Sequence, residues 1–170
     1  MKQSMKAIRV GKVTINMGVG APGDELERAQ TIMKQIVGTK GIQTKAKVRL
    51  PTWEIRPGLP IGVKVTLRKQ KAVDFLKRAL TAKENCLKKS CFDGRGNFGF
   101  GIPEYIDLPE IKYDPQLGVR GLDVLVSLER PGYRISKRKQ CKTKIGMKQV
   151  ISKEKAMQFM TEEFGVTLDG

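Results

Sequence analysis

Residues that could carry out chemistry are unevenly represented in this sequence. Its 170 residues include no histidine, the most common general base and zinc ligand, which argues against most hydrolytic mechanisms. The three cysteines, Cys86, Cys91 and Cys141, lack the paired spacing of a zinc site and are an odd number for a disulfide framework. We therefore expect buried or incidental thiols, no metal, no cofactor and no enzymatic activity.

One glycine pattern has the spacing of a phosphate-binding loop. Gly18, Gly20 and Gly23 follow a predicted strand and precede a predicted helix, as in dinucleotide-binding folds. Those folds also need an acidic residue about 20 positions further on, but no Asp or Glu lies between Glu27 and Glu54. We therefore interpret the glycines as a tight turn. A nucleotide-binding enzyme that uses this turn remains the alternative function.

The strongest chemical feature is positive charge. The chain has 33 Lys and Arg against 17 Asp and Glu, a formal net charge of +16, which predicts a polyanionic partner. Lys and Arg attract phosphates, while hydroxyl and amide groups on the same surface can reach sugars and base edges. The predicted partner is structured RNA.

Three predicted strands would place such groups on one face of a sheet. Residues 9–16, 42–50 and 61–68 each alternate apolar and polar residues, so each strand turns its polar side chains to one side. The predicted polar rows are Lys12, Thr14 and Asn16, then Gln43, Lys45, Lys47 and Arg49, then Lys64, Thr66 and Arg68. A fourth strand over 119–129 completes the sheet.

Apolar residues at helical spacing predict three helices. They cover residues 24–37, 71–87 and 152–164, with Gly38 ending the first. The predicted fold class is α+β: a largely antiparallel β-sheet with α-helices packed on one face and a basic C-terminal extension ending in a helix. We expect an α+β RNA-binding core domain over residues 1–130 and the extension over 131–170.

Two kinds of targeting segment bear on the cellular location of the protein: membrane spans and secretion signals. No apolar run approaches the length needed to span a bilayer, and no secretion signal follows Met1. We therefore expect a cytoplasmic protein that does not contact membranes.

Two further segments are candidates for RNA contact. Residues 130–148 contain Arg130, Arg134, Lys137, Arg138, Lys139, Lys142, Lys144 and Lys148 without one acidic residue. Residues 95–100 are similar to the aromatic strand of RNA-recognition motifs. Because Phe98 and Phe100 share one strand face, we expect them to pack in the core instead of stacking on bases.

Several runs resemble the L-five family of large-subunit ribosomal proteins. They are residues 13–20, 44–47, 55–68, 90–98 and 113–115, and residues 128–138 are similar to the archaeal and eukaryotic branch. The resemblance implies a structural constituent of the large ribosomal subunit, located in its central protuberance. Its implied partners are 5S ribosomal RNA, large-subunit ribosomal RNA, peptidyl-site transfer RNA and neighbouring large-subunit ribosomal proteins. A free-standing RNA chaperone is a further alternative, which would not sediment with large subunits.

The resemblance also carries over to individual positions. Asn16 and Thr66 match family positions that touch 5S RNA, and Thr39 stands where many relatives have Gln. Residues 50–58 match the segment near transfer RNA, with Trp53 where phenylalanine is frequent. The predicted RNA-binding set therefore also includes Thr39, Lys40, Arg134, Lys137, Arg138 and Lys139, and the predicted tRNA-proximal loop includes Trp53, Glu54, Ile55 and Arg56.

Overall fold

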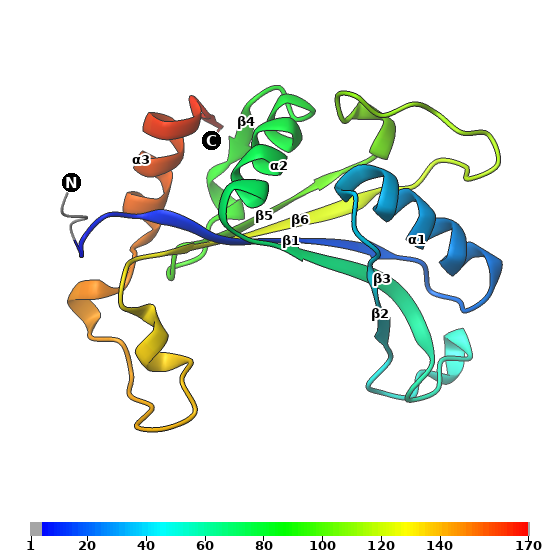
Figure 1. Cartoon of the computed structure of the whole chain (residues 1–170), viewed down its shortest axis with the longest axis horizontal. Coiled ribbons are helices and arrows are strands. Elements are labelled where there is room, and N and C mark those ends of the chain that lie inside the picture. The colour runs from blue at the N-terminus through cyan, green and yellow to red at the C-terminus, as the bar shows by residue number, and fades with distance from the viewer. Residues whose placement is uncertain (1–4, 170) are drawn as a thin grey trace. The chain divides into compact units, whose positions relative to one another are not determined.

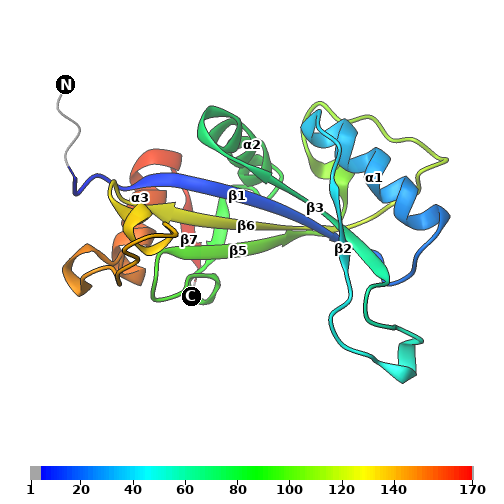
Figure 2. The same ribbon diagram turned by 60° about the horizontal axis from the view of Figure 1, so that its bottom comes forward.

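A computed structural model describes residues 5–169 of the chain. Its elements are β1 (Arg9–Gly18), α1 (Asp24–Val37), β2 (Ile42–Lys45), β3 (Pro60–Leu67), α2 (Lys69–Thr81), β4 (Cys86–Lys88), β5 (Asn97–Ile102), β6 (Leu122–Glu129), α3 (Lys153–Phe164) and β7 (Thr167–Asp169), labelled in Figures 1 and 2. Five strands form one sheet in the order β2-β3-β1-β6-β5, and β4 pairs in parallel with β7. The predicted α+β class, with a mostly antiparallel sheet and a C-terminal helix, is confirmed.

The chain divides into two compact units. Unit 1 comprises Met1–Val13, Arg68–Phe100 and Leu125–Gly170, and unit 2 comprises Thr14–Leu67 and Gly101–Val124. Unit 2 holds α1, β2 and β3, and unit 1 holds α2, α3, β4 and β7.

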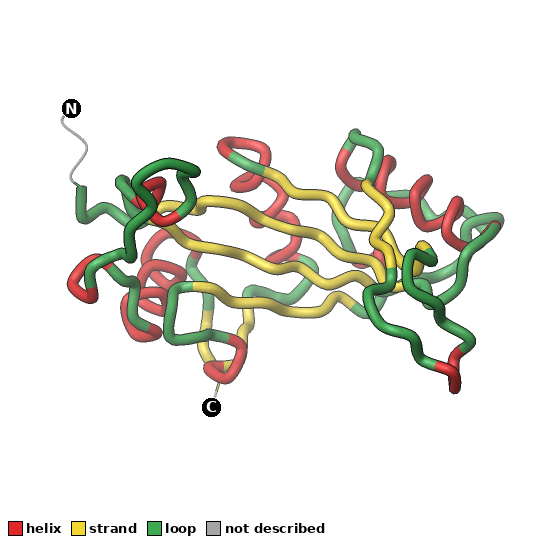
Figure 3. Tube along the Cα trace, turned by 90° about the horizontal axis from the view of Figure 1, so that it is seen from below, coloured by secondary structure: helices red, strands yellow, loops and turns green. Residues whose placement is uncertain are grey.

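The core of unit 2 forms where α1 packs on one face of the strands. Ile15 and Met17 of β1 and Val63 and Val65 of β3 are buried, as the alternation predicted. They meet the apolar stripe of α1, formed by Leu26, Ala29, Ile32, Met33 and Ile36. Figure 1 shows α1 on one side of these strands, and Figure 3, from below, shows the same strands with no helix over them. One face of unit 2 is therefore left open.

Helix α1 begins and ends where its residues predict. Asp24, Glu25 and Glu27 lie in its first turn, where carboxylates favour the positive end of the helix dipole. Gly38 ends the helix with φ at 75°, and its N–H donates to the carbonyl of Lys34 at 2.8 Å.

The second strand is shorter than predicted. β2 ends at Lys45 instead of residue 50, because the register with β3 shifts between Thr44 and Lys45. Its faces also differ from the prediction, since Ile42 pairs with Lys64 and Gln43 pairs with Val63. Gln43 therefore lies on the side of the apolar row, and the side chain of Ile42 is 69% exposed.

The core of unit 1 forms around α2, α3 and aromatic residues. Phe75, Leu76 and Leu80 of α2 are buried, and the rings of Phe92 and Phe98 stack with centroids 4.9 Å apart. Phe98 and Phe100 are both buried, so their predicted core role is confirmed and stacking on RNA bases is excluded.

The second helix also ends earlier than predicted. α2 stops at Thr81 instead of residue 87, because residues 82–85 form a turn in which Glu84 and Asn85 both have φ at 54°. Leu87 is buried from strand β4 instead of from the helix.

The fourth predicted strand keeps its predicted buried residues, whereas the last helix buries its apolar residues only in part, since Phe159 and Phe164 are half-buried. β6 buries Leu122, Val124, Val126 and Leu128, but it starts three positions later than predicted, after a turn at Gly118 with φ at 69°. In α3, Ala156 and Met160 are fully buried, and Ile151 just before it is fully buried too. None of the helices in residues 5–169 is both long and apolar enough to cross a membrane.

Candidate nucleic-acid interface

The open face of unit 2 carries alternating polar residues of β1 and β3. Thr14 and Asn16 are half-buried in β1, and Lys64 and Thr66 are exposed on β3. Their neighbours in sequence pack under α1, so these four side chains point to the opposite side. We call this surface the open face, and hydroxyls, amides and cations like these are the kinds of group that RNA-binding proteins use on sugars, base edges and phosphates.

A glycine lets the strands of the open face approach closely. A Cβ on Gly62 would lie 2.9 Å from the carbonyl oxygen of Met17 and 2.9 Å from Oγ1 of Thr44. The N–H groups of Val19 and Gly20 both donate to the carbonyl of Ile61, at 3.0 and 2.9 Å. The end of β1 is therefore fixed against the start of β3.

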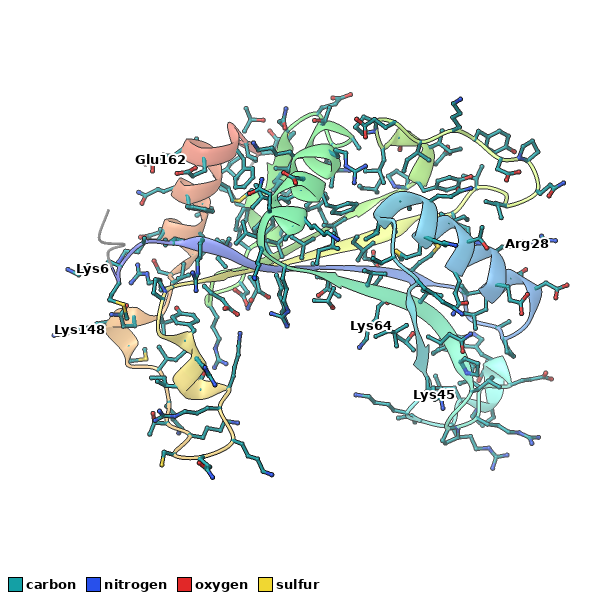
Figure 4. The ribbon with its side chains drawn as sticks, viewed as in Figure 1. Lys6, Arg28, Lys45, Lys64, Lys148 and Glu162 are labelled. Carbon is teal, nitrogen blue, oxygen red and sulfur yellow. The ribbon has the colours of Figure 1, made fainter. Side chains whose placement is uncertain are left out.

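Strand β2 extends the positive charge of the open face. Lys45 is exposed at its end, and Figure 4 places Lys45 and Lys64 on the side of the ribbon away from α1. Thr39 and Lys40 are exposed in the connection from α1 to β2, and Lys47 and Arg49 are exposed beyond β2 in irregular chain. On β6 the exposed Asp123 of unit 2 is acidic, so the positive character does not continue there.

Two predicted cations of the sheet belong to the other unit. Lys12 is half-buried and Arg68 is exposed, and both lie in unit 1. Unit 2 therefore contains nine residues of the predicted set: Thr14, Asn16, Thr39, Lys40, Lys45, Lys47, Arg49, Lys64 and Thr66.

The predicted tRNA-proximal loop projects from β2 and β3 in unit 2 (Figure 2). Trp53 is 69% exposed at the end of a short 3-10 helix, Pro51–Trp53. Leu50 and Ile55 exchange backbone hydrogen bonds at 3.0 and 3.1 Å, and Ile55 is buried. Ile55 therefore holds the loop, while Trp53, Glu54 and Arg56 line a pocket of about 660 Å³ with Gly20 and Arg49.

The basic segment after β6 is a closed loop of unit 1, which we call the basic arm (residues 131–148). Figure 1 shows it leaving the end of β6 and returning to α3. Its base is closed by the hydroxyl of Tyr133, which donates to the carbonyl of Gln149 at 2.7 Å. Arg130 adds a longer contact, from Nη1 to the carbonyl of Lys148 at 3.4 Å.

Arg130 is not available for RNA contact as its charge suggested. It is only 7% exposed and points inward, because it continues the alternation of Leu122, Val124, Val126 and Leu128. That alternation was the signal in the sequence that could have identified it. The predicted cations Arg134, Lys137, Arg138 and Lys139 are exposed on the arm, with Lys137 paired to Glu129.

The glycine turn does not form a nucleotide site. The N–H groups of Val19 and Gly20, which a phosphate would need, already donate to Ile61. Glu25 in the first turn of α1 pairs with Arg120 at 3.0 Å. The nucleotide-binding alternative is therefore contradicted. The three cysteines are free thiols, and residues 5–169 contain no group of three acidic or cysteine side chains placed to hold a metal.

These observations define a class of protein: a strongly basic α+β protein in which helix α1 covers one face of the unit 2 strands and the opposite face presents cations and hydroxyls. Comparison with known proteins is more specific. A family model described as Ribosomal protein L5 matches residues 3–56, and a second model, for the C-terminus of the same ribosomal family, matches residues 60–159. The chain belongs to the ribosomal protein L5 family, whose members are ribosomal proteins and not enzymes.

Individual relatives support the same family over the full length. The large ribosomal subunit protein uL5 of Nanoarchaeum equitans is 50% identical over 169 residues, 99% of each chain. The uL5 protein of Pyrobaculum aerophilum is 46% identical over 165 residues, 97% of this chain and 92% of the relative. That of Methanococcus aeolicus is 45% identical over 171 residues, 99% and 94% respectively.

Proposed function

We propose that this protein is a structural constituent of the large ribosomal subunit that binds 5S ribosomal RNA through the open face of unit 2. The observation that carries the proposal is the row of Thr14, Asn16, Lys64 and Thr66 opposite a fully packed apolar row. Cations on such a face neutralise phosphates without sequence preference, while hydroxyls and amides select the RNA. No reaction is catalysed.

Other surfaces are assigned to other partners. The basic arm contacts large-subunit ribosomal RNA, since its exposed cations Arg134, Arg138 and Lys139 have no acidic neighbour within residues 131–148. The loop with exposed Trp53 and Arg56 lies near the peptidyl-site transfer RNA. Neighbouring large-subunit proteins complete the surroundings, and the protein works in cytoplasmic ribosomes. The names of its relatives, large ribosomal subunit protein uL5, support a place in the large subunit.

Sedimentation tests the ribosomal role directly. Tagged protein expressed at low level should cofractionate with large subunits in sucrose gradients and release 5S RNA when the subunits are dissociated. A variant with Lys45, Lys64 and Thr66 all replaced by alanine should shift toward the top of the gradient, because it loses two cations and one hydroxyl of the open face. Wild-type protein that stays at the top of the gradient would instead support a free-standing RNA chaperone.

A further inference from the structure

The basic arm folds around a pocket of its own. Arg134, Ile135, Arg138, Lys139, Gln140 and Cys141 line a space of about 680 Å³ within unit 1. That volume lies within the range of about 300 to 1,000 Å³ that is typical of small-ligand sites. We call it the arm pocket.

Hydrogen bonds within the arm shape this pocket. The N–H groups of Lys137 and Arg138 both donate to the carbonyl of Arg134 at 2.9 Å, which forms a helical turn under the pocket. Nε of Arg138 donates to the carbonyl of Cys141 at 2.9 Å, and the N–H of Thr143 donates to the carbonyl of Ile135 at 3.2 Å. The chain from 134 to 143 is therefore folded back on itself before any ligand binds.

Charge in the arm pocket is positive, and within residues 5–169 none of its lining cations forms an ion pair. Three of its lining side chains are Arg134, Arg138 and Lys139. The ion pair recorded for the arm in the described part of the chain, Lys137 with Glu129, involves a residue outside the lining. Arg138 is oriented through its Nε, which leaves the two terminal nitrogens of its guanidinium to bind an anion in a fork geometry.

We propose that the arm pocket binds one unpaired RNA nucleotide, with its phosphate held by Arg134, Arg138 and Lys139. Ile135 offers an apolar wall to the base or ribose, and Gln140 offers an amide to its edge. A nucleotide in a bulge or loop can splay its base out of the stack and into a concave site, whereas the bases of a regular duplex stay paired and stacked. The proposal deepens the assignment of the arm to ribosomal RNA and rests on it.

Cys141 supplies a direct reporter because it is one of the residues that line the pocket and it is exposed. In a Cys86→Ser, Cys91→Ser background it is the remaining cysteine, and its alkylation by iodoacetamide can be timed by mass spectrometry. The assay compares a single-stranded RNA oligonucleotide, a duplex of equal charge and inorganic phosphate. We expect the single strand to slow alkylation about tenfold more than the duplex does. Both RNAs have the same charge, but only the single strand has unpaired nucleotides that can enter the pocket.

Two pairs of variants separate a pocket from diffuse charge. Arg134→Gln with Lys139→Gln removes two cations from the lining, and Lys142→Gln with Lys144→Gln removes two arm cations outside it. We expect the first pair to abolish protection of Cys141 and to weaken single-strand binding about tenfold more than the second pair. Equal losses from both pairs would overturn the pocket, as would protection by inorganic phosphate equal to that by RNA at the same concentration.

The same assay distinguishes failure of this inference from failure of the proposed function. Binding of 5S RNA through the open face is measured in parallel on the parent protein and its variants, and all of the arm substitutions lie in unit 1. Retained 5S binding with an unprotected Cys141 overturns the arm pocket alone. Loss of RNA binding in the parent protein overturns the proposed function as well.

Discussion

Lys64 and Thr66 are adjacent members of the same exposed row on β3, but they offer RNA different chemistry. Lysine contributes a charge that releases counterions, and threonine contributes a hydroxyl and a methyl group. Lys64→Ala should therefore lower the steepness of the log–log dependence of 5S affinity on salt by about one. Thr66→Val should weaken 5S binding about tenfold and leave that slope nearly unchanged.

Fluorescence anisotropy of labelled 5S RNA at several salt concentrations measures both quantities. Unrelated duplex RNA serves as the control, and its affinity should respond to Lys64→Ala but not to Thr66→Val. Equal responses of the slope to the two substitutions would contradict the division of roles on β3.

The close approach of the strands at the open face requires a residue without a side chain at Gly62. Gly62→Ala should destabilise the protein by about 1 to 3 kcal/mol, because the new Cβ would meet Met17 and Thr44 at 2.9 Å. Gly94→Ala is the matched control, since a Cβ there meets nothing within 4 Å. Urea denaturation compares the two free energies of unfolding, and similar values would show that the strands can shift to accept the methyl group.

The arm is an element whose base is closed by few bonds. Tyr133→Phe removes the 2.7 Å hydrogen bond to Gln149 while keeping the ring, at a cost of about 1 kcal/mol. The arm should then open about fivefold more often, and trypsin should cleave it about fivefold faster at its exposed lysines and arginines. Tyr113→Phe is the control because Tyr113 is 52% exposed. Identical cleavage rates in both variants would mean that Tyr133 does not hold the arm.

A carboxylate organises the turn before β5. Oδ1 of Asp93 accepts the N–H groups of Arg95 and Asn97 at 2.8 and 2.7 Å, and Oδ2 accepts the amide of Asn97 at 2.7 Å. Partial burial favours the neutral acid, but the hydrogen bonds from Asn97 and Arg95 outweigh it, so the pKa of Asp93 is lowered.

The turn should therefore be sensitive to acid. A lowered pKa in the folded state adds stability that is present above the unfolded value of about 3.9 and is lost as pH falls through the folded pKa. Asp93→Ala should cost about 0.5 to 1 kcal/mol at neutral pH, because solvent screens the bonds of this exposed carboxylate, and less below about pH 4. Thermal unfolding at neutral pH and at about pH 3 tests this, and a constant difference would contradict it.

Elements also show how far the sequence can be interpreted alone. Alternation predicted β1, β3 and β6 because their apolar rows are buried, and Gly38 predicted the end of α1. The same alternation predicted a strand beyond Lys45 that does not form. Val48 and Leu50 are exposed there, so burial of their side chains does not stabilise a strand. The closure of the arm depends on bonds between positions 16 and 18 residues apart, which no local pattern encodes.

The candidate site was also predictable only in part from the sequence. Thr14, Asn16, Lys64 and Thr66 followed from strand periodicity and lie on the open face. The charge of Arg130 predicts a surface position, but its place in the alternation of β6 turns its side chain inward. The arm pocket was not foreseen, since it requires residues 134 and 141 to fold toward each other.

At the scale of the whole molecule, the charge of +16 governs how the protein approaches RNA. Long-range attraction of this kind speeds encounter and weakens with salt, whereas hydrogen bonds to sugars and bases persist. Affinity and selectivity should therefore respond differently to ionic strength. If roughly six cations contact phosphates, the log–log salt slope of 5S binding should be roughly −4 to −5.

The most direct test of the account is a titration of full-length protein with 5S RNA and with unrelated duplex RNA of equal length at several salt concentrations. We predict similar steep slopes for both RNAs and a preference for 5S RNA that survives at high salt, where charge is screened. A slope near zero, or a preference for 5S RNA that disappears as salt rises, would contradict a face that combines cations with selective hydroxyls and amides.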